Sequence, residues 1–234
     1  MRYAILLAIL WTPSRAQDSR AQDENEIVQA YLRAVDTQRS ALRGSRMEAA
    51  IQARLPKLGK SGTLRVSRRI SCSGRIVYQT LESSGDLGVK RDVIARYLNL
   101  DSEEHNADSI AITPANYEFH LKTVLGTPGV RIPVFQLKPR RKQPGLFKGE
   151  LWVDLDTGMP VYEAGQFVRS PSIFLKRVRF ERDYEEWNGI TVPKRIDSVV
   201  ETRIVGRAEI TIEFSEFSQE GCMPNAPSIG GRDE

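Results

Sequence analysis

The sequence predicts an α+β fold in which helices cover a curved antiparallel β-sheet. Hydrophobic residues at helical spacing are confined to residues 26–55 and 89–98, whereas the chain after Thr113 consists mainly of alternating stretches separated by turn residues. Several alternating stretches are polar on one face, which is typical of an antiparallel sheet rather than a buried parallel one. No linker or repeat divides this region, so a single domain over residues 26–218 is expected.

The first 16 residues predict a secretory signal peptide. Met1-Arg2 provides a charged start, residues 3–11 form an apolar run, and the small residues Ser14 and Ala16 stand where signal peptidase reads its site. The apolar run is well below the ~20 residues that span a bilayer. We therefore expect cleavage after Ala16 and a mature protein outside the cytoplasm, soluble or peripheral to a membrane at most.

Helical spacing predicts two N-terminal helices, or one bent helix, and a later inserted helix. Residues 17–25 are polar and are expected to form a flexible leader. From Glu26 to Pro56 apolar residues recur every three or four positions, with an interruption at Gly44. The apolar positions include Ile27, Val28, Tyr31 and Val35, then Met47, Ala50, Ile51 and Leu55. A shorter amphipathic pattern over residues 89–98 predicts the inserted helix, and all of these helices are expected to cover the open side of the sheet.

Alternation predicts two strands before the inserted helix and a meander of about six strands after it. Residues 63–70 and 74–82 form the first pair, and Asn188-Gly189 is a strong signal for a tight hairpin turn further on. The apolar faces of the first, third and last predicted strands are marked by Leu64 and Val66, by Tyr117, Phe119 and Leu121, and by Ile210, Ile212 and Phe214. Residues 219–234 are rich in Gly, Pro, Asn and Ser and predict a disordered tail.

The charge balance argues against a nucleic-acid-binding protein. The chain has 34 basic and 30 acidic residues, and loss of Arg2 and Arg15 with the signal peptide lowers the net charge from +4 to +2. The basic residues that do gather in sequence are Lys138, Arg140, Arg141 and Lys142, with Arg131 and Lys148 nearby. Such a run is either a solvated loop or a contact for anionic lipid headgroups or an acidic partner.

The residues give little support for catalysis, and we expect no enzyme, no metal and no cofactor. His105 and His120 are read as surface residues, since no Gly-x-Ser-x-Gly motif marks a nucleophile. Asp156-Thr157-Gly158 matches the aspartic protease triplet but lies between two alternating stretches, where these residues form an ordinary turn. Cys72 and Cys222 either pair in an oxidising compartment or remain apart, and the sequence leaves both alternatives open.

Several short stretches together resemble the LolA/LolB family of periplasmic outer-membrane lipoprotein-sorting proteins, whose fold the sensor protein RseB shares. They are Asn25–Leu32, Thr113–Phe119, Phe135–Arg140, Phe147–Asp154 and Trp187–Pro193. The resemblance covers roughly residues 25–217 and implies a periplasmic, unclosed β-barrel with helices as a lid over an apolar cavity. It also implies a protein without catalytic residues that binds the acyl chains of lipoproteins.

The resemblance and the strand patterns together predict a monomeric carrier or sensor that binds a lipid or lipoprotein acyl chains. The predicted cavity wall consists of Leu64, Val66, Tyr117, Phe119, Leu121, Ile210, Ile212 and Phe214. The alternative is a binding or scaffold module with a filled core, which contacts an envelope protein or outer-membrane protein partner through an edge strand or the basic loop.

Overall fold

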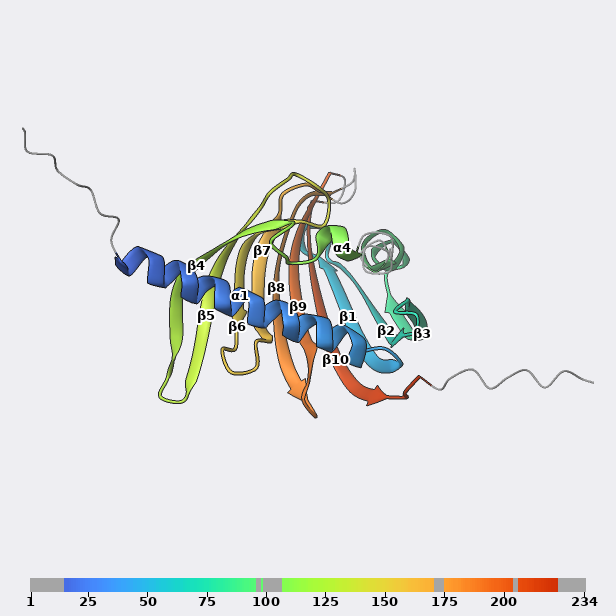
Figure 1. Ribbon diagram of the computed structural model, residues 1–234. Coiled ribbons are helices and arrows are strands. Elements are labelled where there is room, and N and C mark those ends of the chain that lie inside the picture. Colours follow the sequence, from blue (N-terminus) through green and yellow to red (C-terminus); the bar gives the residue numbers. More distant parts are fainter. Residues whose placement is uncertain (1–14, 96–97, 99–106, 171–174, 204–205, 223–234) are drawn as a thin grey trace, which may run out of the picture.

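One open antiparallel sheet dominates the computed structural model, which describes residues 15–95, 98, 107–170, 175–203 and 206–222. The sheet has ten strands in the order β3-β2-β1-β10-β9-β8-β7-β6-β5-β4, and every pair of neighbours is antiparallel (Figure 1). The edge strands β3 and β4 do not pair with each other, so the sheet is curved but not closed. The predicted fold class, an α+β unclosed β-barrel, is confirmed.

The helices and strands have the following bounds. The strands are β1 (Ser45–Leu55), β2 (Lys60–Ile70), β3 (Ile76–Gly85), β4 (Tyr117–Thr127), β5 (Val130–Pro139), β6 (Phe147–Val153), β7 (Pro160–Phe167), β8 (Leu175–Trp187), β9 (Ile190–Thr202) and β10 (Arg207–Gln219). The helices are α1 (Arg15–Ala41), the 3-10 turn η1 (Pro56–Leu58), α2 (Leu87–Val89), the π-helical turn η2 (Lys90–Ile94) and α4 (Ala107–Ile110).

Residues 47–55 form strand β1, and the prediction of a second N-terminal helix there is wrong. The buried side chains of this strand are those of Met47, Ala49, Ile51, Ala53 and Leu55, at a strict spacing of two. Ala50 is exposed and lies on the opposite face. Gly44, with φ +72°, takes the left-handed conformation that turns the chain from α1 into β1.

Residues 17–25 are helical, because α1 begins at Arg15, and the prediction of a flexible leader is wrong for this stretch. Residues 1–14 of the predicted signal peptide lie outside the described residues, as does most of the predicted tail. No helix among the described residues is both long and apolar enough to cross a membrane.

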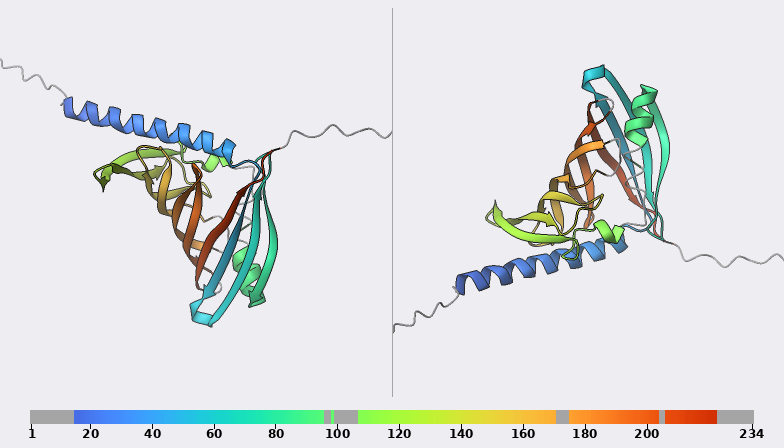
Figure 2. Two further views of the ribbon diagram at one scale, coloured as in Figure 1. Left: turned by 90° about the horizontal axis from the view of Figure 1, so that it is seen from below. Right: turned by 90° about the horizontal axis from the view of Figure 1, so that it is seen from above.

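The two helical elements cover different parts of the sheet. Helix α1 runs beside the part of the sheet that contains β4 to β9, whereas the α2–η2 segment packs against β1 and β2 (Figure 2). The α2–η2 segment coincides with the predicted inserted helix, of which residues 96–97 lie outside the described part. We call the side of the sheet on which both elements pack the inner face.

Candidate functional site

The inner face is apolar at both ends of the sheet and charged in the middle. Cross-strand register places one residue of each strand side by side along a row that crosses the whole sheet. From β2 to β4 this row reads Leu64, Ile51, Ile212, Ile196, Arg182, Glu163, Leu151, Phe135 and Leu121. In this row the ion pair of Arg182 and Glu163 lies between two apolar clusters, which are bridged elsewhere by Phe167, packed against both.

The first cluster, here called the β1 cluster, lies under the α2–η2 segment. Its buried residues are Ala49, Ile51, Ala53, Leu55, Val66, Val89, Val93, Ile94, Val178, Ile196, Val200, Ala208, Ile210 and Ile212. The second, the β6 cluster, lies under α1. Its buried residues are Val28, Tyr31, Tyr117, Phe135, Leu137, Leu146, Phe147, Leu151, Val153 and Phe180.

The predicted cavity-wall residues do not surround one common cavity. Leu64, Val66, Ile210, Ile212 and Phe214 belong to the β1 cluster or pack against it. Tyr117, Phe119 and Leu121 belong to the β6 cluster or pack against it. All eight share the inner face, but they form two groups on either side of the charged seam.

The α2–η2 segment approaches the sheet closely because the floor beneath it is made of small residues. A side chain at Gly62 of β2 would lie 3.3 Å from Val89 Cβ and 3.0 Å from Lys90 Cγ. In the same cluster Ala53 and Ala208 are fully buried, as is Ile94 from the segment. The carboxylate of Asp86 begins the segment by accepting a hydrogen bond from the Val89 amide at 3.0 Å.

Helix α1 is hydrogen-bonded to the sheet at two points. In its first half, the Glu24 carboxylate accepts a hydrogen bond from the Leu121 amide of edge strand β4 at 3.0 Å. Near its end, the Gln38 side chain exchanges two hydrogen bonds with the backbone of Thr191 in β9. Between these points Val28 and Tyr31 are buried in the β6 cluster. Helix α1 is therefore attached to the sheet both by these hydrogen bonds and by the packing of its apolar side chains.

The charged seam on the inner face consists of Glu163, Arg182 and Tyr184, with Tyr31 of α1 beside it. Glu163 Oε1 accepts a hydrogen bond from the Tyr184 hydroxyl at 2.8 Å, and Arg182 Nη1 lies 3.2 Å from Glu163 Oε2. The Glu163 side chain is 6% exposed and that of Arg182 is 35% exposed. Burial, followed by the nearby Glu163 charge, raises the pKa of both tyrosines above its usual value, so both hydroxyls stay protonated.

The sequence does not predict this seam. Glu163 is the single charged residue of its strand, and Arg182 and Tyr184 lie in a strand rich in both acidic and basic residues. The available signal was the spacing of Val178, Phe180 and Arg182, which places the guanidinium on the same face as two buried apolar side chains.

Two hollows outlined by described residues are lined mainly by residues outside the two clusters. An open groove of about 850 Å³ crosses the outer face of β1, β2, β3, β9 and β10. It is lined by Ala50, Ile51, Gln52, Arg54, Thr63, Leu64, Arg65, Glu82, Ser83, Ser84, Arg195, Glu209, Thr211 and Glu213. Most of its charges are paired within the sheet, as with Arg65, which bonds to Glu48 and Glu82. A smaller hollow of about 250 Å³, the end hollow, lies between the β8–β9 hairpin and the end of β10.

The predicted basic contact residues are divided between two ends of the sheet. Arg131 lies near the tip of the β4–β5 hairpin, opposite Gly126, whereas Lys138 lies at the other end of β5, opposite Glu118. Within the basic loop, Lys138 pairs with Glu118 at 3.0 Å and Arg141 bonds to Asn116 at 2.9 Å. Arg140, Lys142 and Lys148 are exposed at this same end. The structure therefore gathers five of the six residues and leaves Arg131 apart.

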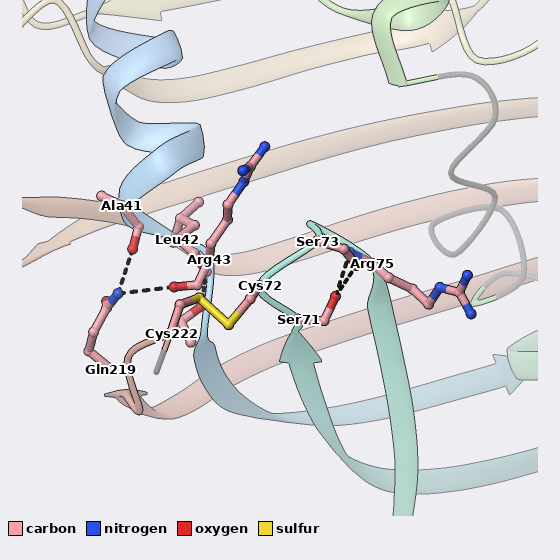
Figure 3. Close-up of a disulfide and its surroundings, with 10 residues drawn as sticks. Ala41, Leu42, Arg43, Ser71, Cys72, Ser73, Arg75, Gln219 and Cys222 are labelled. Carbon is pink, nitrogen blue, oxygen red and sulfur yellow. Dashed lines mark hydrogen bonds between the residues drawn. A yellow bond between two sulfur atoms is a disulfide. The ribbon is translucent and has the colours of Figure 1, made fainter. Parts of the chain in front are cut away.

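Cys72 and Cys222 form a disulfide, with their Cα atoms 5.5 Å apart. The bond ties the β2–β3 turn to the chain that follows β10, beside the end of α1 (Figure 3). At this junction the Gln219 side chain donates hydrogen bonds to the carbonyl oxygens of Ala41 and Arg43. The Glu220 amide also bonds to Gly44 at 2.8 Å, so the ends of α1, β2 and β10 meet in one place.

The residues considered for catalysis are not brought together. His120 lies on the outer face beside Gln136, and His105 lies outside the described residues. Asp154 Oδ1 accepts hydrogen bonds from the Asp156 and Thr157 amides, so the Asp156-Thr157-Gly158 triplet forms a capped turn. Within the described part of the chain, no group of three or more His, Cys, Asp or Glu side chains is arranged to hold a metal ion.

A ten-stranded unclosed β-barrel with separate helical covers is the class that this architecture defines. No protein-family model and no curated protein sequence matches the chain. Among solved structures it is similar to a DUF1329 family protein from Desulfovibrio piger, at 13% identity over 86% of this chain and 95% of that one, with a TM-score of 0.48.

Two other similar structures carry the name expected from the sequence. A LolA superfamily protein from Nitrosomonas europaea is 15% identical over 85% of this chain and 95% of that one, with a TM-score of 0.40. A domain described as that of an outer-membrane lipoprotein-sorting protein, from Vibrio parahaemolyticus, is 10% identical over 88% and 95%, with a TM-score of 0.48. The resemblance inferred from the sequence is thus found again among the structural neighbours, and at these identities it concerns the fold alone.

Proposed function

We propose that the protein is a periplasmic, non-catalytic carrier or sensor that holds a lipid, or the acyl chains of a lipoprotein, on the inner face of its sheet. The observation that carries the proposal is the α2–η2 segment, which packs Val89, Val93 and Ile94 on the aliphatic β1 cluster, where Gly62, Ala53 and Ala208 leave room for it. These side chains occupy the space that an acyl chain would need. Binding therefore consists of exchanging the segment for the ligand.

The two covers have different roles in this exchange. Helix α1 is hydrogen-bonded to the sheet through Glu24 and Gln38 and remains in place over the β6 cluster. The α2–η2 segment is short, and its attachment to the sheet combines apolar contacts with polar ones to Ser61, Lys60 and Ser83 near the chain ends of β2 and β3. The acyl chain then lies along the β1 cluster, with the charged seam marking the end of its path.

An acyl chain must replace the apolar contacts that Val89, Val93 and Ile94 make with the sheet. The free energy of those contacts therefore sets a minimum length for the chain. Three fully buried aliphatic side chains contribute about 1.5–3 kcal/mol each, which amounts to about 5–9 kcal/mol in all. Each buried methylene of an acyl chain returns about 0.8 kcal/mol. An acyl chain therefore displaces the segment only when it buries about 6–11 methylenes.

The proposal is tested by displacement of a hydrophobic fluorescent probe from the purified mature protein with saturated fatty acids of 6 to 16 carbons. Affinity should rise steeply between the short and the long chains, for the reason just given. Ile94→Ala weakens the cover and should tighten binding of the 16-carbon acid. The matched control is Leu146→Ala, because Leu146 is equally buried but belongs to the β6 cluster.

A lack of uptake of any chain by the wild type and by Ile94→Ala would overturn the carrier proposal. The second candidate is then an envelope protein-binding or scaffold module with a filled core. The close burial of the inner-face side chains in both clusters favours this alternative. Native mass spectrometry of protein purified from a periplasm distinguishes the two, since a carrier shows a bound lipid mass that organic extraction removes.

A further inference from the structure

The end hollow is built by an irregularity in β10. The register of β1 with β10 passes from Arg46 opposite Ser218 directly to Glu48 opposite Ser215, so β10 carries an extra residue at this point. Glu216 adopts φ +53°, a left-handed conformation that non-glycine residues seldom take. Such bulges redirect a side chain, and such strain is found most often where a site requires it.

Phe217 also lies within the bulge, and its ring packs on Trp187. Their ring centroids are 4.8 Å apart with an interplanar angle of 66°. Trp187 is held by the tight turn of the β8–β9 hairpin, where Asn188 and Gly189 both have positive φ. It is nevertheless 38% exposed, so the aromatic pair offers part of its surface to solvent.

The rest of the end hollow combines an apolar floor with two carboxylates. Met47 and Val192 are buried on the floor, and Glu185 and Glu216 are exposed members of the lining. Glu185 has one cationic neighbour, Lys194 at 3.8 Å, in a pair whose two side chains are 46% and 62% exposed. A pair so exposed contributes little and is readily exchanged.

We propose that the end hollow binds a cationic side chain, an arginine above all, from a partner polypeptide. A guanidinium stacks on an indole or phenyl face and donates hydrogen bonds to carboxylates, and both groups line the same hollow. The volume of about 250 Å³ lies below the range of about 300–1,000 Å³ that is usual for a whole small-molecule ligand. A single long side chain is the better fit.

The carboxylates of Glu185 and Glu216 favour a cation that can donate hydrogen bonds over one that cannot. A quaternary ammonium group gains from the aromatic surface but has no proton to donate to Glu185 or Glu216. Met47 and Phe214 of the lining belong to the inner face, but no residue of the α2–η2 segment lines the end hollow, so the proposal does not depend on an acyl ligand. It assigns a partner contact to an acidic and aromatic surface, whereas the sequence had suggested the basic loop.

The test is titration of the full mature chain with N-acetylarginine amide, followed by tryptophan fluorescence and by amide NMR shifts at residues 185–192 and 214–217. The neutral isostere N-acetylcitrulline amide and the quaternary ion tetramethylammonium are titrated in parallel. Arginine should bind at least about tenfold more tightly than either, because the charge-assisted hydrogen bonds are lost in both.

Substitutions in the lining of the end hollow show whether arginine binds there. Glu185→Gln and Glu216→Gln should each weaken arginine binding by about three- to tenfold, and Trp187→Leu should remove most of the NMR shifts. Glu186→Gln is the matched control, since Glu186 is the neighbouring exposed residue in β8 but is not part of the lining. Circular dichroism establishes that each variant folds.

Equal affinity for arginine and citrulline would overturn the proposal, as would tetramethylammonium binding as tightly as arginine. An unchanged affinity in Glu185→Gln and Glu216→Gln, or an equal loss in Glu186→Gln, would also overturn it. If arginine binds while no fatty acid does, the carrier proposal fails and this one stands, so the two outcomes remain distinguishable.

Discussion

Asp86 controls the covering segment at the scale of a single residue. Its carboxylate lies 3.0 Å from Lys60 Nζ and accepts a hydrogen bond from the Val89 amide. The hydrogen bond from Lys60, then that from the amide, lowers the pKa of Asp86 below its usual value. The capping contribution is therefore complete above about pH 4, the unfolded-state pKa, and is lost as the pH falls through the lower folded-state pKa.

We expect protection of the α2–η2 amides against hydrogen exchange to fall as the pH is lowered below about 4, while the β6 amides stay protected. In Asp86→Asn this acid-induced loss should disappear, because the titrating group is gone, whereas protection at neutral pH should change little, since asparagine caps a helix about as well as aspartate. Parallel behaviour of the α2–η2 and β6 amides in the wild type would show that the segment does not open separately.

At the scale of elements, α1 is the most firmly held cover. Tyr31→Ala removes a side chain that is 4% exposed and lies in the β6 cluster, so we expect a loss of about 3–5 kcal/mol in the free energy of unfolding. Gln29→Ala changes an exposed position of the same helix and should alter stability by less than about 0.5 kcal/mol. Urea denaturation measures both, and similar midpoints for the two variants would mean that α1 is not part of the cooperative fold.

The elements also show how far the sequence could predict the fold. The β4 and β10 strands were predicted because their apolar positions are large and alternate with charged ones. Strand β1 was missed because Ala49 and Ala53, which complete its spacing of two, are small and favour helices as well. Their size has a packing reason, since they make room for the α2–η2 segment, and that reason lies far away in the chain.

The candidate site was less predictable than the fold for a similar reason. The inner-face residues were correctly assigned to one face by alternation, but their division into two clusters depends on Arg182 and Glu163. These two residues become neighbours only through the register of β7 with β8. The end hollow depends on the bulge at Glu216, and no residue preference in the sequence predicts a bulge at that position.

At the scale of the whole molecule, the disulfide joins residues 150 positions apart. Replacing both Cys72 and Cys222 by serine releases the end of β10 from the β2–β3 turn. We expect a loss of about 2–5 kcal/mol in the free energy of unfolding. Denaturant curves should show the same loss when the wild type is reduced, and reduction should have no effect on the double variant. An unchanged midpoint in the double variant would exclude a stabilising role.

The position of β10 in the sheet has a consequence for how the chain is completed. The last strand pairs with β1 on one side and β9 on the other, and it is the only link that the described register shows between β3-β2-β1 and β9 to β4. Contacts between such distant parts of a sequence form late, because a long loop must close first. A chain cut short before Arg207 would therefore be left as two unjoined half-sheets, each with an additional open edge. The unpaired N–H and C=O groups along those edges would be free to pair with strands of other chains, so such a product is expected to aggregate rather than to fold.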